Sequence, residues 1–148
     1  MSTASDKKVI HVHLGDEDYK TILTAGNHEL ISDEPERAGG QDLGPDPYDY
    51  LLMSLGSCTV ITLRMYAKRK KWPVEDIYVE LLHHKDHAED CEDCDEKSAK
   101  IDKIEKDIIV KGDLSDEQLK RLLEISENCP VNKTLKGDIE MNTNIELR

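Results

Sequence analysis

The amino-acid sequence predicts an α+β fold with the element order βββ-α-ββ-α-β. Apolar and polar residues alternate in the N-terminal third, a pattern that is typical of strands. The run Leu51–Leu63 carries no charge and has helical spacing, which indicates a helix that is buried on most of its sides. A second helical pattern with a polar cap, Ser115–Glu127, follows a stretch rich in β-branched residues. Because no repeat or low-complexity linker divides the chain, we expect a single domain over residues 1–148.

Residues 1–32 are expected to form a small antiparallel β-meander. Its strands are predicted at Lys8–Leu14, Tyr19–Thr24 and His28–Ser32, because apolar residues alternate there and turn-forming residues separate them. The segment that follows, residues 33–47, is rich in proline and glycine. We therefore expect a sharply bent loop that leads the chain into a central helix.

The central helix is expected over residues 46–72. Asp46 can cap its first turn, and Pro47 suits the first helical position. Basic residues near its end suit the negative end of the helix dipole, and Trp72-Pro73 stops it. Its apolar and small residues fall on two stripes, with Leu51, Leu52, Leu55, Cys58, Thr59 and Thr62 on one and Met53, Val60, Leu63 and Ala67 on the other.

Two further strands are expected on either side of a hydrophilic loop at residues 85–100. The first is Val74–His84, in which Ile77, Val79 and Leu81 share a face. The second, Ile101–Lys111, is ambiguous, since its isoleucines also fit helical spacing. We interpret it as a strand because its β-branched run ends at a glycine turn.

The C-terminal part is expected to hold a helix, a short helical turn and a last strand. Ser115–Glu127 has a capping box, and we expect a buried stripe made by Leu119, Leu122 and Leu123. A proline then allows a short helical turn at Val131–Leu135. Alternating apolar residues predict the last strand at Ile139–Ile145.

The net charge of −12 argues against nucleic acid and against an anionic membrane surface as partners, because both require a basic surface. The uncharged run in the central helix is too short to span a bilayer. The polar segment Met1–Lys8 does not resemble a signal peptide, so a cytoplasmic location is expected. In that compartment cysteines are normally reduced, which favours reactive, buried or metal-binding thiols over structural disulfides.

Two cysteines have sequence contexts that allow chemistry. Cys58 lies in the central helix beside Gly56, and a glycine inside a helix costs about 1 kcal/mol relative to alanine, which indicates that another element packs closely there. The ordinary interpretation of Cys58 is a small buried apolar residue, and a reactive thiol is the alternative. Cys129 precedes Pro130, where a helical turn can begin, and a thiol at a helix N-terminus has a lowered pKa. The local sequence therefore favours Cys129 as a thiolate, whereas Cys58 would need a nearby cation or hydrogen-bond donor.

A second pair of cysteines lies in the acidic loop. Cys91 and Cys94 form a C-x-x-C pattern with His87 just upstream, and two thiols with an imidazole could hold zinc or another metal. A redox pair fits less well, since the pattern does not open a helix after a strand. The simplest alternative is a solvated acidic loop without a ligand.

Two segments together resemble one known family. GPDPYDYLLMSLGSCTVITLRMYA, residues 44–67, and the distant NCPV, residues 128–131, resemble the motifs of the OsmC/Ohr family of osmotically inducible and organic hydroperoxide resistance proteins. The resemblance extends from about His28 to the end of the chain. It implies an intertwined homodimer in which two central helices pack together and are wrapped by β-sheets.

The resemblance also implies a thiol-dependent peroxidase that reduces organic hydroperoxides, and hydrogen peroxide as a further substrate. Cys58 would attack the O–O bond and become a sulfenic acid, and Cys129 would condense with it to a disulfide. A lipoyl protein or a thioredoxin-like protein would act as the dithiol reductant, and no cofactor is required. Family members use a carboxylate and an arginine near the thiol. Asp49 stands at the acidic position of the motif, and Arg37 is the candidate cation.

A non-enzymatic protein of the same fold is the alternative. Such a dimer would bind a small apolar ligand or a partner protein near the two thiols, with or without a metal site at Cys91 and Cys94. The resemblance does not distinguish these functions, because a fold carries many activities.

Overall fold

The computed structural model describes residues 7–87 and 100–148 and has the α+β class that the sequence predicts. The chain divides into two compact units, Met1–Leu51 and Leu52–Arg148. Whether the whole chain forms a single domain, as the sequence predicts, is not tested by this division.

The first unit contains the predicted β-meander. Strands β1 (Ile10–Leu14), β2 (Thr21–Ala25) and β3 (His28–Ser32) form an antiparallel sheet in the order β1-β2-β3. The loop that follows is organised by the buried carboxylate of Asp33, which accepts hydrogen bonds from the backbone amides of Glu34, Gln41 and Leu43 at 2.8, 3.2 and 3.2 Å. This loop includes the short 3-10 helix η2 (Glu36–Ala38).

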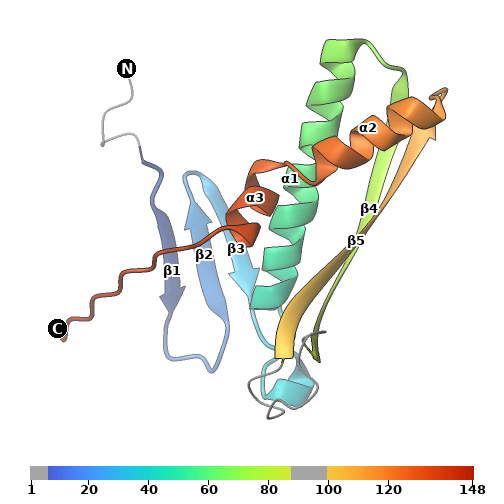
Figure 1. The fold of residues 1–148 in the computed structure, drawn as a ribbon. Coiled ribbons are helices and arrows are strands. Elements are labelled where there is room, and N and C mark those ends of the chain that lie inside the picture. Colours follow the sequence, from blue (N-terminus) through green and yellow to red (C-terminus); the bar gives the residue numbers. More distant parts are fainter. Residues whose placement is uncertain (1–6, 88–99) are drawn as a thin grey trace. The chain divides into compact units, whose positions relative to one another are not determined.

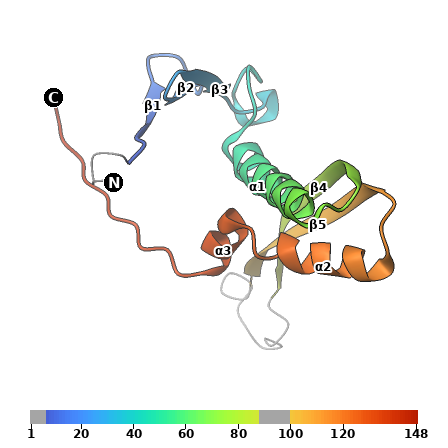
Figure 2. The same ribbon diagram turned by 90° about the horizontal axis from the view of Figure 1, so that it is seen from above.

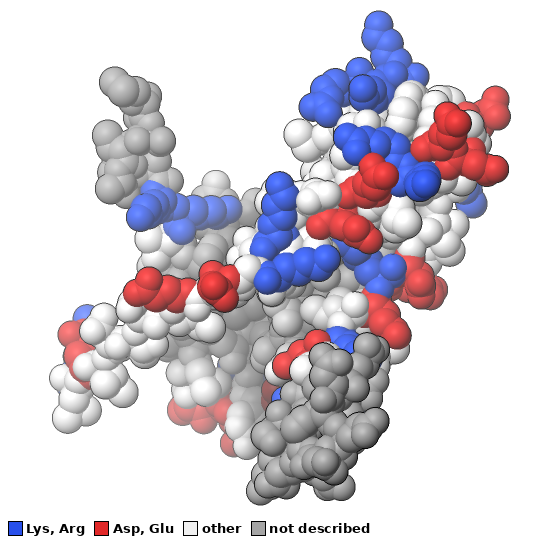
Figure 3. All heavy atoms as spheres, viewed as in Figure 1, with Lys and Arg blue, Asp and Glu red and all other residues white. Residues whose placement is uncertain are grey.

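Helix α1 (Pro47–Lys70) begins and ends as the sequence predicts. At its start the Asp46 carboxylate accepts from the Asp49 amide at 2.9 Å, and the Asp49 carboxylate accepts from the Asp46 amide at 3.0 Å. These reciprocal bonds satisfy two backbone donors that the helix itself leaves unpaired. At its end Lys71 adopts a left-handed conformation with φ of 59°, which turns the chain out of the helix. Figure 3 shows Lys and Arg side chains gathered around this end of α1.

The second unit is built on a long antiparallel hairpin of β4 (Val74–His87) and β5 (Lys100–Gly112), so the ambiguous segment is a strand. α1 and helix α2 (Asp116–Ser126) lie beside this hairpin in Figures 1 and 2. β4 packs closely against Gly56, since a Cβ built there would lie 2.7 Å from Leu81 Cδ1. This contact explains why a glycine is found inside the helix.

The core of the second unit joins α1, the hairpin and α2. Its buried members are Leu63, Tyr66, Ala67, Val74 and Leu122, and the partly buried residues against them include Ile77, Ile108, Val110 and Ile125. The Ser115–Gln118 capping box is present at the start of α2, as predicted. The predicted stripe of three leucines is too wide, since Leu119 and Leu123 are 43% and 57% exposed and only Leu122 is buried.

The predicted last strand, Ile139–Ile145, is wrong for this chain. Helix α3 (Pro130–Lys136) confirms the expected helical turn, but residues 138–148 form neither helix nor strand. A strand requires a neighbouring strand to pair with its backbone groups, and no strand among residues 7–87 and 100–148 pairs with this segment. Ile145 and Leu147 are both 99% exposed, so these apolar side chains do not pack against any other part of the described chain.

Candidate functional site

The fold of the second unit brings Cys58 and Cys129 together. Cys58 lies in α1 and is half-buried, whereas Cys129 is the residue that precedes α3 and is completely buried. The backbone amide of Val131, in the first turn of α3, donates to Cys58 Sγ at 3.5 Å. Both thiols are free, and the more accessible one is Cys58.

The surroundings of Cys129 favour its thiolate. Burial raises the pKa of this thiol, but hydrogen bonds with Thr59, with the backbone of Asn132 and with Cys58 lower it. The nearby positive charge of Lys106 lowers it as well. The net result is a pKa below the ordinary thiol value, which agrees with the sequence-based expectation for Cys129.

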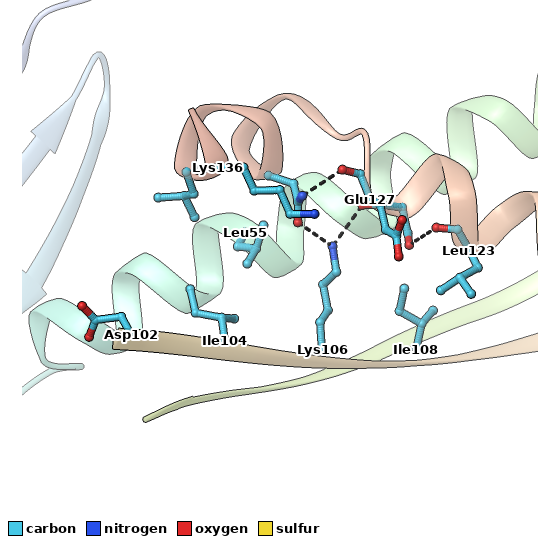
Figure 4. A pocket seen from close by; sticks show the side chains of 11 residues that line it. Leu55, Asp102, Ile104, Lys106, Ile108, Leu123, Glu127 and Lys136 are labelled. Atoms are coloured by element: carbon cyan, nitrogen blue, oxygen red, sulfur yellow. Dashed lines mark hydrogen bonds between the residues drawn. The ribbon is translucent and has the colours of Figure 1, made fainter. Parts of the chain in front are cut away.

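Lys106 carries the charge beside these thiols. Its Nζ atom donates to Thr59 Oγ1 at 3.1 Å, to the Ser126 carbonyl oxygen at 3.0 Å and to Asn132 Oδ1 at 3.2 Å. Thr59 is fully buried, and its Oγ1 atom lies 3.6 Å from Cys129 Sγ. Figure 4 shows Lys106 rising from β5 toward these partners, between Ile104 and Ile108.

Burial lowers the pKa of Lys106, while the nearby Cys129, Cys58 and Glu127 raise it and Lys136 lowers it. The balance leaves the pKa of this amine below its ordinary value. The thiols and the three hydrogen-bond acceptors offset only part of the desolvation of the ammonium group.

Lys106 is not among the site residues that the sequence predicts. In the β5 pattern Ile104, Ile108 and Val110 mark the face that packs against the helices, and Lys106 occupies the same face at the period of two. A lysine in the apolar register of a strand was the available signal, because a lysine that is removed even partly from solvent needs partners and often carries a function.

A cavity of about 420 Å³ adjoins this group of residues. Apolar side chains of Leu55, Ile104, Ile108, Leu123 and Leu135 contribute to its wall, and Lys106, Asn132, Glu127 and Lys136 contribute polar atoms (Figure 4). A cavity with this lining can accept a small molecule that has an apolar body and a polar end.

The two candidate activators of Cys58 lie in the first unit. Asp49 is exposed, and its carboxylate is engaged in the reciprocal cap at the start of α1. Arg37 is exposed in η2. Because both residues belong to the first unit and Cys58 to the second, their action on the thiol remains a prediction.

Arg64, the other cation near Cys58 in sequence, is used elsewhere. Its guanidinium donates to the carbonyl oxygens of Val74 at 2.6 Å and Glu75 at 3.2 Å, where it ties α1 to the start of β4.

The predicted metal site falls largely outside the described residues. Cys91 and Cys94 lie in the segment that is not described, and His87 is the last residue of β4. Within residues 7–87 and 100–148 no group of three or more His, Cys, Asp or Glu side chains could hold a metal ion. In the same residues no helix is long and apolar enough to cross a membrane.

Solved structures share the fold at low sequence identity. An OsmC-like protein from Mycoplasma pneumoniae matches with a TM-score of 0.72 and 18% identity over 89% of each chain. The organic hydroperoxide resistance protein OsmC from Legionella pneumophila matches with a TM-score of 0.64 and 18% identity over 88% of this chain and 90% of that one. An organic hydroperoxide resistance protein from Elizabethkingia anophelis, with thiocyanate bound, matches with a TM-score of 0.66 and 17% identity over 90% and 91%.

No curated protein matches the chain. A family model described as OsmC-like protein does match, and it covers residues 39–144, which include α1, the β4–β5 hairpin and both cysteines. The chain belongs to the OsmC-like protein family.

Proposed function

We propose that this protein is a thiol-dependent peroxidase that reduces organic hydroperoxides to alcohols, with hydrogen peroxide as a further substrate. The observation that carries the proposal is the meeting of Cys58 and Cys129 at the start of α3, from two segments far apart in the sequence. The names of the Legionella and Elizabethkingia proteins support the same class of substrate.

The two thiols have different roles because they differ in their exposure to solvent. Cys58, the more accessible thiol, attacks the terminal oxygen of the hydroperoxide as a thiolate, and the O–O bond breaks. Cys58 becomes a sulfenic acid, and the alkoxide takes a proton and leaves as the alcohol. Cys129, which is buried beside it, then forms the Cys58–Cys129 disulfide and releases water. A dithiol reductant, either a lipoyl protein or a thioredoxin-like protein, exchanges with this disulfide and restores both thiols.

The donors around Cys58 fit this role in part. The amide of Val131 donates to Cys58 Sγ and places this sulfur at the start of α3. We assign Arg37 and Asp49 to the activation of Cys58 as part of the proposal, and no metal or organic cofactor takes part in the steps above.

We also propose that the active form is a homodimer in the cytoplasm. One face of α1 exposes Met53, Ile61 and Met65, which are 53%, 54% and 67% accessible in the single chain. These residues recur at a helical spacing of four or eight and form a stripe that a second copy could cover. A reducing compartment keeps the thiols in the state that the reaction needs.

A second candidate function is supported by the cavity of about 420 Å³ beside Lys106. Its apolar wall suits a small apolar ligand, so the protein could act as a non-enzymatic binding dimer. This candidate predicts that any slow hydroperoxide turnover persists in Cys58→Ser, since the thiol would then take no part in it.

The experiment that tests the peroxidase follows loss of cumene hydroperoxide in the presence of a dithiol, with wild type, Cys58→Ser and Cys129→Ser compared. We expect Cys58→Ser to lose turnover and Cys129→Ser to accumulate a Cys58 sulfenic acid that dimedone traps. Cys94→Ser serves as the matched thiol control and should turn over normally. Equal rates for wild type and Cys58→Ser would contradict the proposal.

A further inference from the structure

The ammonium group of Lys106 is fixed by three acceptors that use each of its three N–H donors. The acceptors come from three helical segments: Thr59 lies in α1, Ser126 is the last residue of α2 and Asn132 lies in α3. Asn132 is itself held, because its Nδ2 atom donates to the carbonyl oxygen of Glu127 at 2.8 Å. A charge tied in this way keeps one position relative to the thiols.

The hydroxyl of Thr59 links this charge to Cys129. Thr59 Oγ1 has one proton, and it lies 2.9 Å from the Leu55 carbonyl oxygen and 3.6 Å from Cys129 Sγ. Because Lys106 donates to the same oxygen, the Thr59 proton goes either to Leu55 or to the sulfur. With a neutral thiol, Cys129 donates and Thr59 bonds Leu55. With a thiolate, the hydroxyl turns and donates to the sulfur.

The Lys106 bond favours the second arrangement. An N–H donated to a hydroxyl oxygen polarises the O–H, which strengthens its own donation, above all to a negative acceptor. Cys129 needs such help, because it has no exposed surface and burial alone favours a neutral thiol.

We propose that Lys106, acting through the Thr59 hydroxyl, is the positioning residue that holds Cys129 as a thiolate for the resolving attack on oxidised Cys58. This inference rests on the proposed function. The Cys129 thiolate attacks the sulfur of the Cys58 sulfenic acid, the S–S bond forms and the S–O bond breaks. Hydroxide leaves with the S–O electron pair and takes a proton from solvent. The hydroperoxide has supplied the oxidising equivalents in the preceding step.

The other charged side chains near Lys106 and Cys129 include one of each sign. Glu127, which follows α2, and Lys136, in α3, act on Lys106 in opposite directions, and Cys58 faces both the thiol and the amine from α1. The charge that acts on Cys129 is therefore that of Lys106.

Two variants test separately the charge of Lys106 and the hydroxyl of Thr59 that relays its effect to Cys129. Lys106→Met removes the charge and keeps an unbranched side chain, whereas Thr59→Val removes the hydroxyl and keeps the shape. Lys106→Arg keeps a cation, and Lys111→Met removes an exposed lysine from the same strand as a control. Circular dichroism and thermal unfolding establish that each variant is folded, and Thr59→Val tests the relay even where a change at Lys106 prevents folding.

The first measurement is the pKa of Cys129, from ultraviolet absorbance of the thiolate in full-length protein in which the other three cysteines are serine. We expect this pKa to rise in Lys106→Met and in Thr59→Val, to rise less in Lys106→Arg and to stay unchanged in Lys111→Met. The second measurement is the lifetime of the Cys58 sulfenic acid after one equivalent of cumene hydroperoxide, by dimedone trapping in protein with all its cysteines.

The lifetime should lengthen about threefold for each unit by which the Cys129 pKa rises, because the smaller thiolate fraction is offset in part by a more nucleophilic thiolate. The rate of sulfenic acid formation should remain within about twofold in Thr59→Val, since that step belongs to Cys58 and this variant keeps the Lys106 charge beside it. An unchanged Cys129 pKa in folded Lys106→Met and Thr59→Val would overturn this inference while leaving the peroxidase intact. Wild type that forms no sulfenic acid would instead contradict the proposed function, and the resolving role with it.

Discussion

The Nζ atom of Lys106 lies 3.1 Å from the Oγ1 atom of Thr59, and this hydrogen bond joins β5 to α1 beside the buried thiol of Cys129. The bond places a cation from the β-hairpin against the helix that carries Cys58.

Stability should rise with pH from neutral to alkaline values under reducing conditions. The folded chain lowers the pKa of Cys129 below the 9.0 of an ordinary thiol, so between the two values the unfolded chain binds more protons. This contribution is complete above the unfolded pKa and is lost as pH falls through the folded one. Lys106 also makes stability rise with pH, because folding lowers the pKa of its amine as well.

Urea unfolding of wild type and Cys129→Ser at a series of pH values measures the effect. We expect the variant to show a shallower rise of stability with pH, while Lys111→Met, a change at an exposed residue, keeps the wild-type slope. Parallel profiles for wild type and Cys129→Ser would show that folding does not perturb the thiol.

Asp49→Asn should separate the capping role of Asp49 from its proposed chemical role. Asparagine keeps an oxygen that can accept from the Asp46 amide, so the loss of stability should stay below about 1 kcal/mol. Asparagine carries no charge, so the assistance that the Asp49 carboxylate is proposed to give Cys58 is lost. Hydroperoxide turnover should therefore fall by about tenfold or more. Thermal unfolding and turnover are measured on the same samples, with Asp49→Ala expected to lose both. Full activity in Asp49→Asn would leave the carboxylate a cap and nothing more.

Charges introduced on the exposed face of α1 should separate the proposed dimer. Ile61→Glu and Met65→Glu place a carboxylate where a second copy would bury an apolar side chain, and an unpaired charge there is costly. We expect both variants to have half the wild-type mass by light scattering at micromolar concentrations. Lys68→Glu, an exposed change in the same helix, is the control. Wild type that is monomeric at these concentrations would contradict the dimer.

The metal site predicted at Cys91, Cys94 and His87 can be tested directly. Protein purified without chelator should contain about one zinc ion per chain by elemental analysis, and Cys94→Ser should lose it, since a zinc site needs its thiolate ligands. His87→Ala should weaken binding without removing both thiols. Metal-free wild type that does not take up added zinc would leave the loop without this role. The peroxidase is unaffected by either result.

The sequence predicted much of the local structure because its signals act over a few residues. Asp46 and Pro47 begin α1, Ser115 and Gln118 form their capping box, and the alternation in β5 marks the inner face of that strand. Cys129 was expected to precede a helical turn and does. Each of these depends on neighbours within four positions, which the sequence shows directly.

The failures came where a neighbour had to be supplied from elsewhere. Ile139–Ile145 has the alternation of a strand, but it pairs with no strand in the part of the chain that the structure describes. Leu119 and Leu123 have helical spacing but are exposed, since the surface that α2 covers is narrower than the stripe. Periodicity reports which residues could be buried, whereas burial depends on the surface that is available.

For the candidate site, the two thiols, their separate contexts and the family of their motifs could be predicted from the sequence. The charge that accompanies the thiols could be found only in the folded chain. Lys106 is 23 residues before Cys129 and 47 residues after Thr59 in the chain, and the three meet because β5 passes beneath both α1 and α3. A cation stabilises a thiolate through distance and desolvation, and both are properties of the folded arrangement that no local pattern contains.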